Sequence, residues 1–315
     1  MKRLVLVSGT ANLPLSEKIA EHLGMTLVDS QVRKFANGEI CCQISQNVRG
    51  ADVFVIQSVC PPNVNDNLME LLIVIDALKR ASAESIIAVI PHYGYARQDR
   101  KVTPRTPISS KLVADLLTIA GATRIITVDV HSGQIQGFFN IPFDNIYASP
   151  VLLDYLKKEN WEREIVCVSP DSGGVERVRN FAKVLRCDLA MIDKRRVAPN
   201  VAKAMNIVGD VRNKDVIIID DIIDTAGTLI EAVNPLKNHG AMRIFVCATH
   251  PVFSDPAYER ISRCESLTGI IVTDTVPIPA QWRGLDKLKV LSVAEILSKA
   301  IHYTFNDDSL SSLFI

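Results

Sequence analysis

Residues 216–229, VIIIDDIIDTAGTL, bring together the groups that a bound sugar phosphate needs. The apolar run predicts a buried strand that carries Asp220 and Asp221 to its carboxyl end, where ligands bind in open α/β sheets. A loop of small residues then opens a helical pattern, and helix starts expose amide groups that suit a phosphate. Paired carboxylates can accept hydrogen bonds from sugar hydroxyls. The loop residues are Asp224, Thr225, Ala226, Gly227 and Thr228.

An ordinary helix start after a strand is the alternative interpretation of this loop, because Asp and Thr are common at such places. The doubled Asp and the strand in front of the loop favour a binding site. The sequence has no lysine after Gly227 and no G-x-x-x-x-G-K-[ST] pattern, so the stretch is not a Walker A loop.

A basic triplet, Lys194, Arg195 and Arg196, follows the apolar run LAMID. Cations at this place could neutralise charge on a transferred phosphoryl group, because phosphoryl transfer depends on positioning and electrostatics. A loop that carries them could also close over substrate and exclude water. Taken alone, however, such a triplet more often belongs to a solvated loop.

Asp129 and His131 stand two residues apart at the end of the apolar run IITVDV. On an extended chain their side chains would face the same side. Mg²⁺ prefers oxygen ligands and keeps several waters, so a histidine ligand is unusual unless phosphates supply most of the shell. A structural histidine fits this spacing at least as well.

Eight apolar runs rich in Val and Ile predict the strands that must position these side chains. Continuous rather than alternating runs are typical of parallel sheets buried on both faces. The runs are 4–7, 53–59, 86–90, 125–130, 165–169, 216–220, 244–249 and 270–274. Helical patterns lie at 15–23, 67–78 (with Asn67 as N-cap), 107–120, 149–159, 174–186, 226–238, 255–263 and 293–302.

The alternation of strands and helices in both halves predicts an α/β fold with two domains related by a loose duplication. We place the boundary where PFDNIYASP interrupts the pattern. The predicted domains are residues 1–146 and 147–302. The apolar end of the tail, 303–315, is expected to dock on the first domain.

The composition excludes several classes of protein. The 315 residues contain 35 Lys plus Arg and 35 Asp plus Glu, and the resulting pI near 7.0 argues against nucleic acid as the main partner. No segment approaches the roughly 18 apolar residues of a membrane helix, and the run 4–7 is too short for a signal peptide. Seven cysteines without a C-x-x-C pair predict free thiols in a reducing cytoplasm.

Several motifs resemble the ribose-phosphate pyrophosphokinase family, whose members are also called phosphoribosyl pyrophosphate synthetases. The loop at 220–228 is similar to the sugar-phosphate loop of type I phosphoribosyltransferases. The other motifs, spread over nearly the whole chain, are FANGE (35–39), NDNLMELL (65–72), GYARQDR (94–100), VDVHSGQIQGFF (128–139), PDSGGVERVR (170–179) and IDKRR (192–196). The resemblance implies two phosphoribosyltransferase-type domains, with parallel sheets flanked by helices.

The activity implied by the resemblance is transfer of the β,γ-diphosphoryl group of ATP to the 1-hydroxyl of ribose 5-phosphate. AMP is released, and the product serves nucleotide, histidine and tryptophan biosynthesis. Lys194 matches the catalytic lysine, and Arg196 would contact ribose 5-phosphate together with Asp220, Asp221 and the loop 224–228. The residues that match the ATP site of the first domain are Phe35, Asn37, Gly38, Glu39, Arg97 and Gln98.

Mg²⁺ is the cofactor that the resemblance implies, with His131 and Asp171 as ligands and Asp129 beside them. The family also works as a hexamer, which implies a homo-oligomer whose ATP site spans a subunit interface. FANGE alone could equally be a turn before the strand EICCQIS.

The sequence departs from the family pattern at four places. Ala36 stands where Ser is usual, and Asn140 where Asp is common. The segment 60–67 is one residue longer and the segment 97–109 one residue shorter than the pattern. The second of these loops binds phosphate and ADP in family members, so the sequence leaves open whether activation by phosphate and inhibition by ADP are retained.

Three other functions compete with the synthetase. The first is an inert paralogue that regulates the active enzyme, but such paralogues have altered catalytic loops, whereas Lys194, Arg196, His131 and Asp171 are all present. The second is a phosphoribosyltransferase that consumes the product, against which the two α/β halves argue. The third is a sensor that uses the ribose 5-phosphate pocket as a ligand switch.

Overall fold

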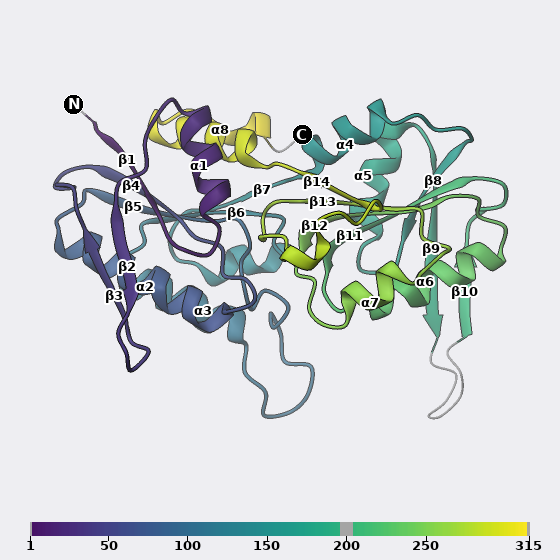
Figure 1. Cartoon of the computed structure of the whole chain (residues 1–315), viewed down its shortest axis with the longest axis horizontal. Helices are drawn as coiled ribbons and strands as arrows, with labels where there is room; N and C mark the ends of the chain where they lie inside the picture. The colour runs from purple at the N-terminus through teal and green to yellow at the C-terminus, as the bar shows by residue number, and fades with distance from the viewer. Residues whose placement is uncertain (1, 196–203, 314–315) are drawn as a thin grey trace. The chain divides into compact units, whose positions relative to one another are not determined.

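The computed structural model describes residues 2–195 and 204–313 (Figure 1). The chain forms two compact units, each with its own apolar core. Unit 1 consists of Met1–Ala148, Thr275–Pro277 and Ser292–Ile315, and unit 2 consists of Ser149–Asp274 and Ile278–Leu291. None of the helices in the described part of the chain has the length and apolar character that crossing a bilayer requires.

A five-stranded parallel sheet forms the centre of unit 1. Its spatial order is β1 (Leu4–Ser8), β4 (Asp52–Ile56), β5 (Ser85–Ile90), β6 (Arg124–Val128) and β7 (Phe143–Ile146). The strands β1, β4, β5 and β6 are buried almost throughout, as expected for a sheet covered on both faces. A separate antiparallel hairpin joins β2 (Ser30–Lys34) to β3 (Ile40–Ile44).

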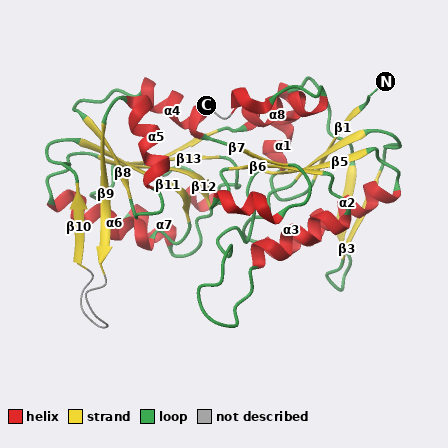
Figure 2. Cartoon of the chain, turned by 180° about the vertical axis from the view of Figure 1, so that it is seen from behind, coloured by secondary structure: helices red, strands yellow, loops and turns green. Residues whose placement is uncertain are grey.

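Helices cover both faces of this sheet (Figures 1 and 2). One face carries α1 (Leu13–His22) and α8 (Ala294–Phe305), and the other carries α2 (Val64–Arg80) and α3 (Ser109–Ala120). Short 3-10 turns lie at Gly133–Phe138 and Leu310–Leu313. The turn at Leu310–Leu313 contacts α8, so the chain terminus belongs to unit 1.

Unit 2 contains a seven-stranded sheet. Its spatial order is β10 (Ala204–Val208), β9 (Asp188–Arg195), β8 (Ile165–Ser169), β11 (Asp215–Ile223), β12 (Ile244–Pro251), β13 (Gly269–Thr273) and β14 (Leu288–Leu291). Only the β9–β10 pair is antiparallel among these described strands. The flanking helices are α4 (Ser149–Lys158), α5 (Val175–Leu185), α6 (Gly227–Asn238) and α7 (Ala257–Ser262), with a 3-10 turn at Ala280–Trp282.

The two halves of the chain repeat one series of elements. In the described residues, the series from β1 to α4 matches the series from β8 to α8, element by element. The sheet order β1-β4-β5-β6-β7 also matches β8-β11-β12-β13-β14. Each half inserts an antiparallel pair between its first and second parallel strands, β2–β3 in one and β9–β10 in the other. The predicted fold class and its duplication are therefore confirmed.

The last helix of each repeat belongs to the other unit. Helix α8 closes the second repeat but contacts α1 of unit 1, whereas α4 closes the first repeat but contacts α5 of unit 2. The compact units thus differ from the predicted ranges 1–146 and 147–302, because residues 292–302 fold with unit 1. Sequence order alone cannot reveal this exchange, since it depends on which apolar face each helix covers.

All eight predicted strands and all eight predicted helices are present, with shifted ends. The N-cap prediction is wrong: α2 is capped by Asn63, and Asn67 lies inside the helix. The buried side chain of Asn67 instead donates from Nδ2 to the carbonyl oxygen of Cys60, at 2.8 Å. The strands β2, β7, β9, β10 and β14 have no counterpart among the predicted runs, and β3 was expected only as the strand EICCQIS.

Candidate active site

The pair Asp220–Asp221 lies within β11, three and two residues before the strand ends at Ile223. The side chain of Asp221 is 8% exposed and that of Asp220 is 35% exposed. The amide of Asp221 donates to Oδ1 of Asp220 at 2.8 Å, so the local backbone fixes one of the two carboxylates. The pair is thus held at the carboxyl end of a central strand, as the sequence predicts.

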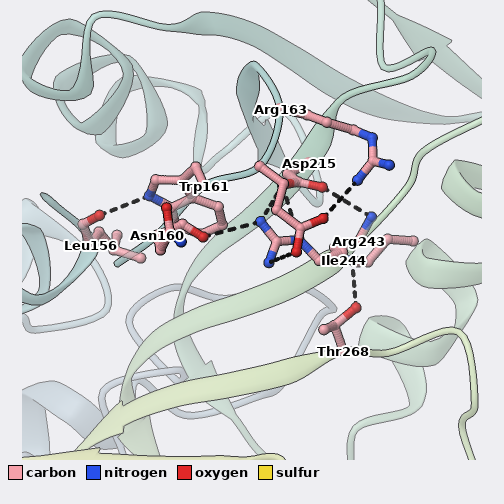
Figure 3. Close-up of polar contacts among 9 residues, drawn as sticks. Leu156, Asn160, Trp161, Arg163, Asp215, Arg243, Ile244 and Thr268 are labelled. Carbon is pink, nitrogen blue, oxygen red and sulfur yellow. Dashed lines mark hydrogen bonds and ion pairs between the residues drawn. The ribbon is translucent and has the colours of Figure 1, made fainter. Parts of the chain in front are cut away.

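The opposite end of β11 is anchored by a buried ion pair (Figure 3). Asp215 is fully buried and accepts hydrogen bonds from Nε of Arg243 at 3.0 Å and from Nη2 at 2.5 Å. The guanidinium also lies 5.7 Å from the centre of the Trp161 ring. This arrangement fixes the strand five residues before Asp220, and no motif in the sequence pointed to it.

The loop after β11 turns sharply into α6. Ala226 has φ +58°, a left-handed conformation that costs a residue with a Cβ atom some free energy, and α6 begins at the next residue. Ala226 is the N-cap residue of this helix, and its methyl side chain forms no capping hydrogen bond to the first amides. Nη1 of Arg260, in α7, donates to the carbonyl oxygen of Thr225 at 2.8 Å and braces the loop. Arg260 is therefore a supporting residue that no motif in the sequence identifies.

Arg177, in the first turns of α5, lies within ion-pair distance of both members of the acidic pair. Its Nη1 lies 3.5 Å from Oδ1 of Asp221 and 4.0 Å from Oδ1 of Asp220. Burial, followed by the hydrogen bond and the negative charge of Asp221, raises the pKa of Asp220 to about 8, although Arg177 acts in the opposite direction. Two carboxylates so close together resist carrying two charges, so the pair is prepared to share a proton.

Asp171 lies in the loop between β8 and α5, beside the acidic pair in sheet order because β8 pairs with β11. Its Oδ1 accepts hydrogen bonds from the amides of Gly173 and Gly174, at 2.9 and 3.0 Å. The residue is exposed. An exposed carboxylate at a strand end suits Mg²⁺, whose shell consists mostly of water and phosphate oxygens.

Lys194 and Arg195 of the basic triplet are the last two residues of β9. The backbone of Lys194 pairs with Met205 of β10, and β9 runs parallel to β8. Arg196 lies outside the described residues, as do the following residues up to 203.

The motif FANGE forms the tip of the β2–β3 hairpin. The amide of Phe35 donates to the carbonyl oxygen of Glu39 at 2.8 Å, and Gly38 has φ +90°, which favours glycine. Oδ1 of Asn37 accepts the Glu39 amide at 3.1 Å, while 53% of Phe35 is exposed. The segment is therefore a turn before a strand, and it also displays an aromatic ring that could stack on a base.

The loop that follows β5 carries Arg97 and Gln98, both exposed. Oε1 of Gln98 accepts a hydrogen bond from Oγ of Ser109 at 2.6 Å, which ties the loop to the start of α3. Oδ2 of Asp99 accepts one from Oγ of Ser132, also at 2.6 Å. The second bond joins this loop to the segment containing His131, so the structure brings these two predicted regions of unit 1 together.

The expectation that Asp129 and His131 face one side of an extended chain is wrong. β6 ends at Val128, and Asp129 has φ +40°, so the backbone is not extended between them. Oδ2 of the buried Asp129 accepts the amide of Ala148 at 3.0 Å. His131 is exposed in the following loop. The carboxylate of Asp129 thus supports the end of the sheet.

In unit 1, the carboxylate of Glu70 lies near the place that corresponds to the loop 224–228 of unit 2. The buried Glu70 of α2 accepts hydrogen bonds from the amide and Oγ1 of Thr10, at 2.6 and 2.7 Å, and from Nε2 of Gln57, at 3.0 Å. Thr10 and Gln57 follow β1 and β4, the counterparts of β8 and β11. Thr10 and Gln57 therefore already donate to a carboxylate of the protein itself.

Metal binding in the described residues does not depend on a preformed cluster. No group of three or more His, Cys, Asp and Glu side chains is arranged there to hold an ion. A closed transition-metal centre would require such a group. An ion held by one or two carboxylates together with substrate phosphates, the usual mode for Mg²⁺, fits the donors that are present.

Comparisons with known proteins identify the family of the chain. Residues 4–121 match the family model of the N-terminal domain of ribose phosphate pyrophosphokinase, and residues 193–315 match that of the phosphoribosyl synthetase-associated domain. The ribose-phosphate pyrophosphokinase of Caldanaerobacter subterraneus is 53% identical over 99% of this chain and 98% of its own. That of Wolinella succinogenes is 51% identical over the whole of both chains.

A solved structure has the same fold. The crystal structure of phosphoribosylpyrophosphate synthetase from Mycobacterium smegmatis superposes with a TM-score of 0.92 and 44% identity, and covers 97% of this chain and 100% of that one. Both relatives are identical to this chain at about half of the residues over its full length, and both family models match it. These findings agree with the resemblance seen in the motifs. The chain belongs to the ribose-phosphate pyrophosphokinase family.

Proposed function

We propose that the protein is a ribose-phosphate diphosphokinase. The 1-hydroxyl oxygen of ribose 5-phosphate attacks the β-phosphorus of ATP, and the bond from that phosphorus to the oxygen bridging it to the α-phosphate breaks. The hydroxyl proton passes to solvent, and the products are phosphoribosyl pyrophosphate and AMP. The observation that carries this proposal is the acidic pair of β11 followed by an uncapped helix start, within a chain of this family.

Ribose 5-phosphate is assigned to unit 2. The phosphate would accept hydrogen bonds from the loop Asp224, Thr225, Ala226, Gly227 and Thr228 at the start of α6. The ribose hydroxyls would donate to Asp220 and Asp221, whose charge Arg177 partly balances. The chemistry of the two ends of the substrate supports this assignment. The anionic phosphate suits the start of a helix, and the ribose hydroxyls can donate to carboxylates.

ATP is assigned to unit 1. The exposed ring of Phe35 would stack on adenine, and Asn37, Gly38 and Glu39 would approach the base edge. Arg97 offers a planar fork for phosphate oxygens, with Gln98 beside it. These roles rest on the match to the family motif and on the exposure of Phe35, Arg97 and Gln98.

Lys194 and Arg196 are assigned to catalysis. Their cations would stabilise the charge of the transferred diphosphoryl group, with Arg196 also contacting ribose 5-phosphate. Losing one such preorganised group typically lowers a rate by about 10²- to 10³-fold. Lys194 lies at the end of β9, which pairs with β8, the strand that leads to Asp171.

Mg²⁺ is the proposed cofactor, and it would supply charge neutralisation on the phosphate oxygens. Asp171 and His131 would hold the ion together with the ATP phosphates, and Asp129 would support the segment that carries His131. Asp171 presents a carboxylate whose orientation the two glycine amides fix. His131 lies on the exposed loop after β6.

The remaining assignments concern the cellular compartment and the oligomeric state of the protein. We assign the protein to the cytoplasm, as a homo-oligomer of the hexameric kind, with neither nucleic acid nor membrane as a partner. The free state of all seven cysteines is consistent with a reducing compartment. The exposed aromatic tip at Phe35 is a surface that a second copy could cover.

Product analysis tests this function. Purified protein is supplied with ATP, Mg²⁺ and ribose 5-phosphate, and the reaction is repeated with Lys194→Ala. AMP and phosphoribosyl pyrophosphate in equal amounts, reduced about 100-fold or more in the variant, are the expected result. ADP as the nucleotide product would mean simple phosphoryl transfer and would refute the proposal. Binding of ribose 5-phosphate without turnover would point to the inert regulatory paralogue.

A further inference from the structure

The start of α2 contacts two separate segments of the predicted ATP site. On one side, Nζ of Lys34 lies 2.5 Å from Oδ2 of Asp66, and Lys34 is the residue directly before Phe35. On the other side, the phenolic oxygen of Tyr95 donates to Oδ1 of Asn65, and Tyr95 lies two residues before Arg97. The neighbouring residues Asn65 and Asp66 thus reach the FANGE hairpin and the loop 94–100 from a single helix turn.

The helix start is itself firmly fixed. Nδ2 of the buried Asn67 donates to the carbonyl oxygen of Cys60, at 2.8 Å, and Oε1 and Nε2 of Gln57 bond to Ala11 and Glu70, at 3.0 Å each. Glu70 lies one turn further along α2 and is 5% exposed. A rigid element therefore supports Asn65 and Asp66, as precise positioning of a site requires.

The loop 94–100 needs such support because its backbone is strained. Tyr95 has φ +67°, a left-handed conformation that is uncommon for a bulky residue. Its carbonyl oxygen accepts the amide of Gln98 at 2.9 Å, so the orientation of Tyr95 sets where Arg97 and Gln98 lie. The hydrogen bond to Asn65 holds the ring end of Tyr95 in place while the backbone makes this turn.

We propose that Asn65 and Asp66 are positioning residues for ATP, which hold the hairpin tip and the loop 94–100 in the arrangement that binds the nucleotide. Neither residue is assigned to contact ATP. Asp66 fixes the end of β2 through Lys34, and Asn65 fixes the loop through Tyr95. The inference rests on the proposed function, because it takes Phe35 and Arg97 as parts of the ATP site.

Kinetics of three variants test the inference. Asn65→Ala is expected to raise the KM for ATP about 3- to 10-fold, as loss of a hydrogen bond does. Asp66→Asn is expected to raise it about 2- to 5-fold, because the ion pair is half-exposed. The KM for ribose 5-phosphate and the melting temperature should not change. The double variant Lys34→Asp with Asp66→Lys exchanges the two charges of the ion pair. Its KM for ATP should return most of the way from the value of Asp66→Asn to that of the wild type.

The matched control lies at the other end of the same helix. Asp76→Asn removes an exposed ion pair in which Oδ2 of Asp76 lies 2.7 Å from Nε of Arg80. This variant should leave both KM values unchanged. An equal rise in the KM for ATP in Asp76→Asn, or a rise in both KM values of the Asn65 and Asp66 variants, would overturn the positioning role.

Hydrogen exchange separates this inference from the proposed function. Asp66→Asn should speed amide exchange at 35–39, and Asn65→Ala should speed it at 94–98, whether or not the protein makes phosphoribosyl pyrophosphate. If the wild-type protein makes no such product, the proposed function fails and exchange alone decides whether the two segments are held from α2. Unchanged exchange in both variants would refute the inference.

Discussion

The carboxylate of Asp215 is fully buried and is bound by two nitrogens of Arg243, five residues before Asp220 on the same strand. A charge without contact to water requires such a partner, because its transfer into the interior is costly. The pair therefore stabilises the strand that carries the acidic residues of the site, from the end where no substrate is expected (Figure 3).

Arg243→Ala should destabilise unit 2 by about 3–5 kcal/mol, because it leaves a buried carboxylate without a partner. Scanning calorimetry would show this as a lower melting temperature for one of the transitions. Arg263→Ala is the matched control, since Arg263 pairs with Glu259 at 2.5 Å on the surface, where such pairs contribute about 0–1 kcal/mol. Equal losses in the two variants would contradict a special role for the buried pair.

Asp220→Asn should stabilise the protein, increasingly so as pH rises. The pKa of Asp220 is raised from 3.8 to about 8, so the folded protein holds a proton that the unfolded chain has already released. Each rise in pH between these values therefore costs the wild type folding free energy. Asn, which resembles the protonated acid, avoids that loss.

Melting temperatures from about pH 5 to about pH 8 provide the measurement for Asp220→Asn. The difference between variant and wild type should grow across this range and then level off. Asp210→Asn, at an exposed carboxylate of the same unit, should follow the wild type at every pH. A difference for Asp220→Asn that does not vary with pH would mean that the acidic pair does not share a proton.

Removing residues 292–315 should unfold part of unit 1 while unit 2 stays protected. Helix α8 contacts α1 and buries Ile296, Leu297 and Ile301, so its loss exposes the apolar face of α1. Hydrogen exchange should then quicken in α1 and β1. A shorter deletion, 309–315, retains α8 and should show little effect. Faster exchange in β8 and α5 instead would contradict the assignment of α8 to unit 1.

The parts of this fold that the sequence predicts are those with a strong local signal. The central strands are buried on both faces and appear as continuous apolar runs, and the helices between them keep their periodicity. An edge strand such as β14 has no such signal, because half of its side chains face solvent. The partner of α8 is equally hidden, since an apolar stripe does not specify which unit it will cover.

The candidate site shows the same division. The loop 224–228 and the acidic pair follow a recognisable strand, so their placement could be predicted. Arg177 and Arg260 have no motif, and they support the site only because α5 and α7 bring them to it. The error at Asp129 has a similar origin, because the strand ends one residue before it and a single left-handed residue changes the direction of the chain.

The exchange of α4 and α8 has a consequence for the origin of the chain. Two copies of one ancestral α/β protein that traded their final helices would form an intertwined dimer, and joining the copies end to end would give the present order of elements. After such a fusion the two copies could diverge in sequence, so that one copy carried Glu70 with its hydrogen bonds to Thr10 and the other carried the loop 224–228. A symmetric pair of binding sites would thereby have become two different halves, each free to specialise for one substrate.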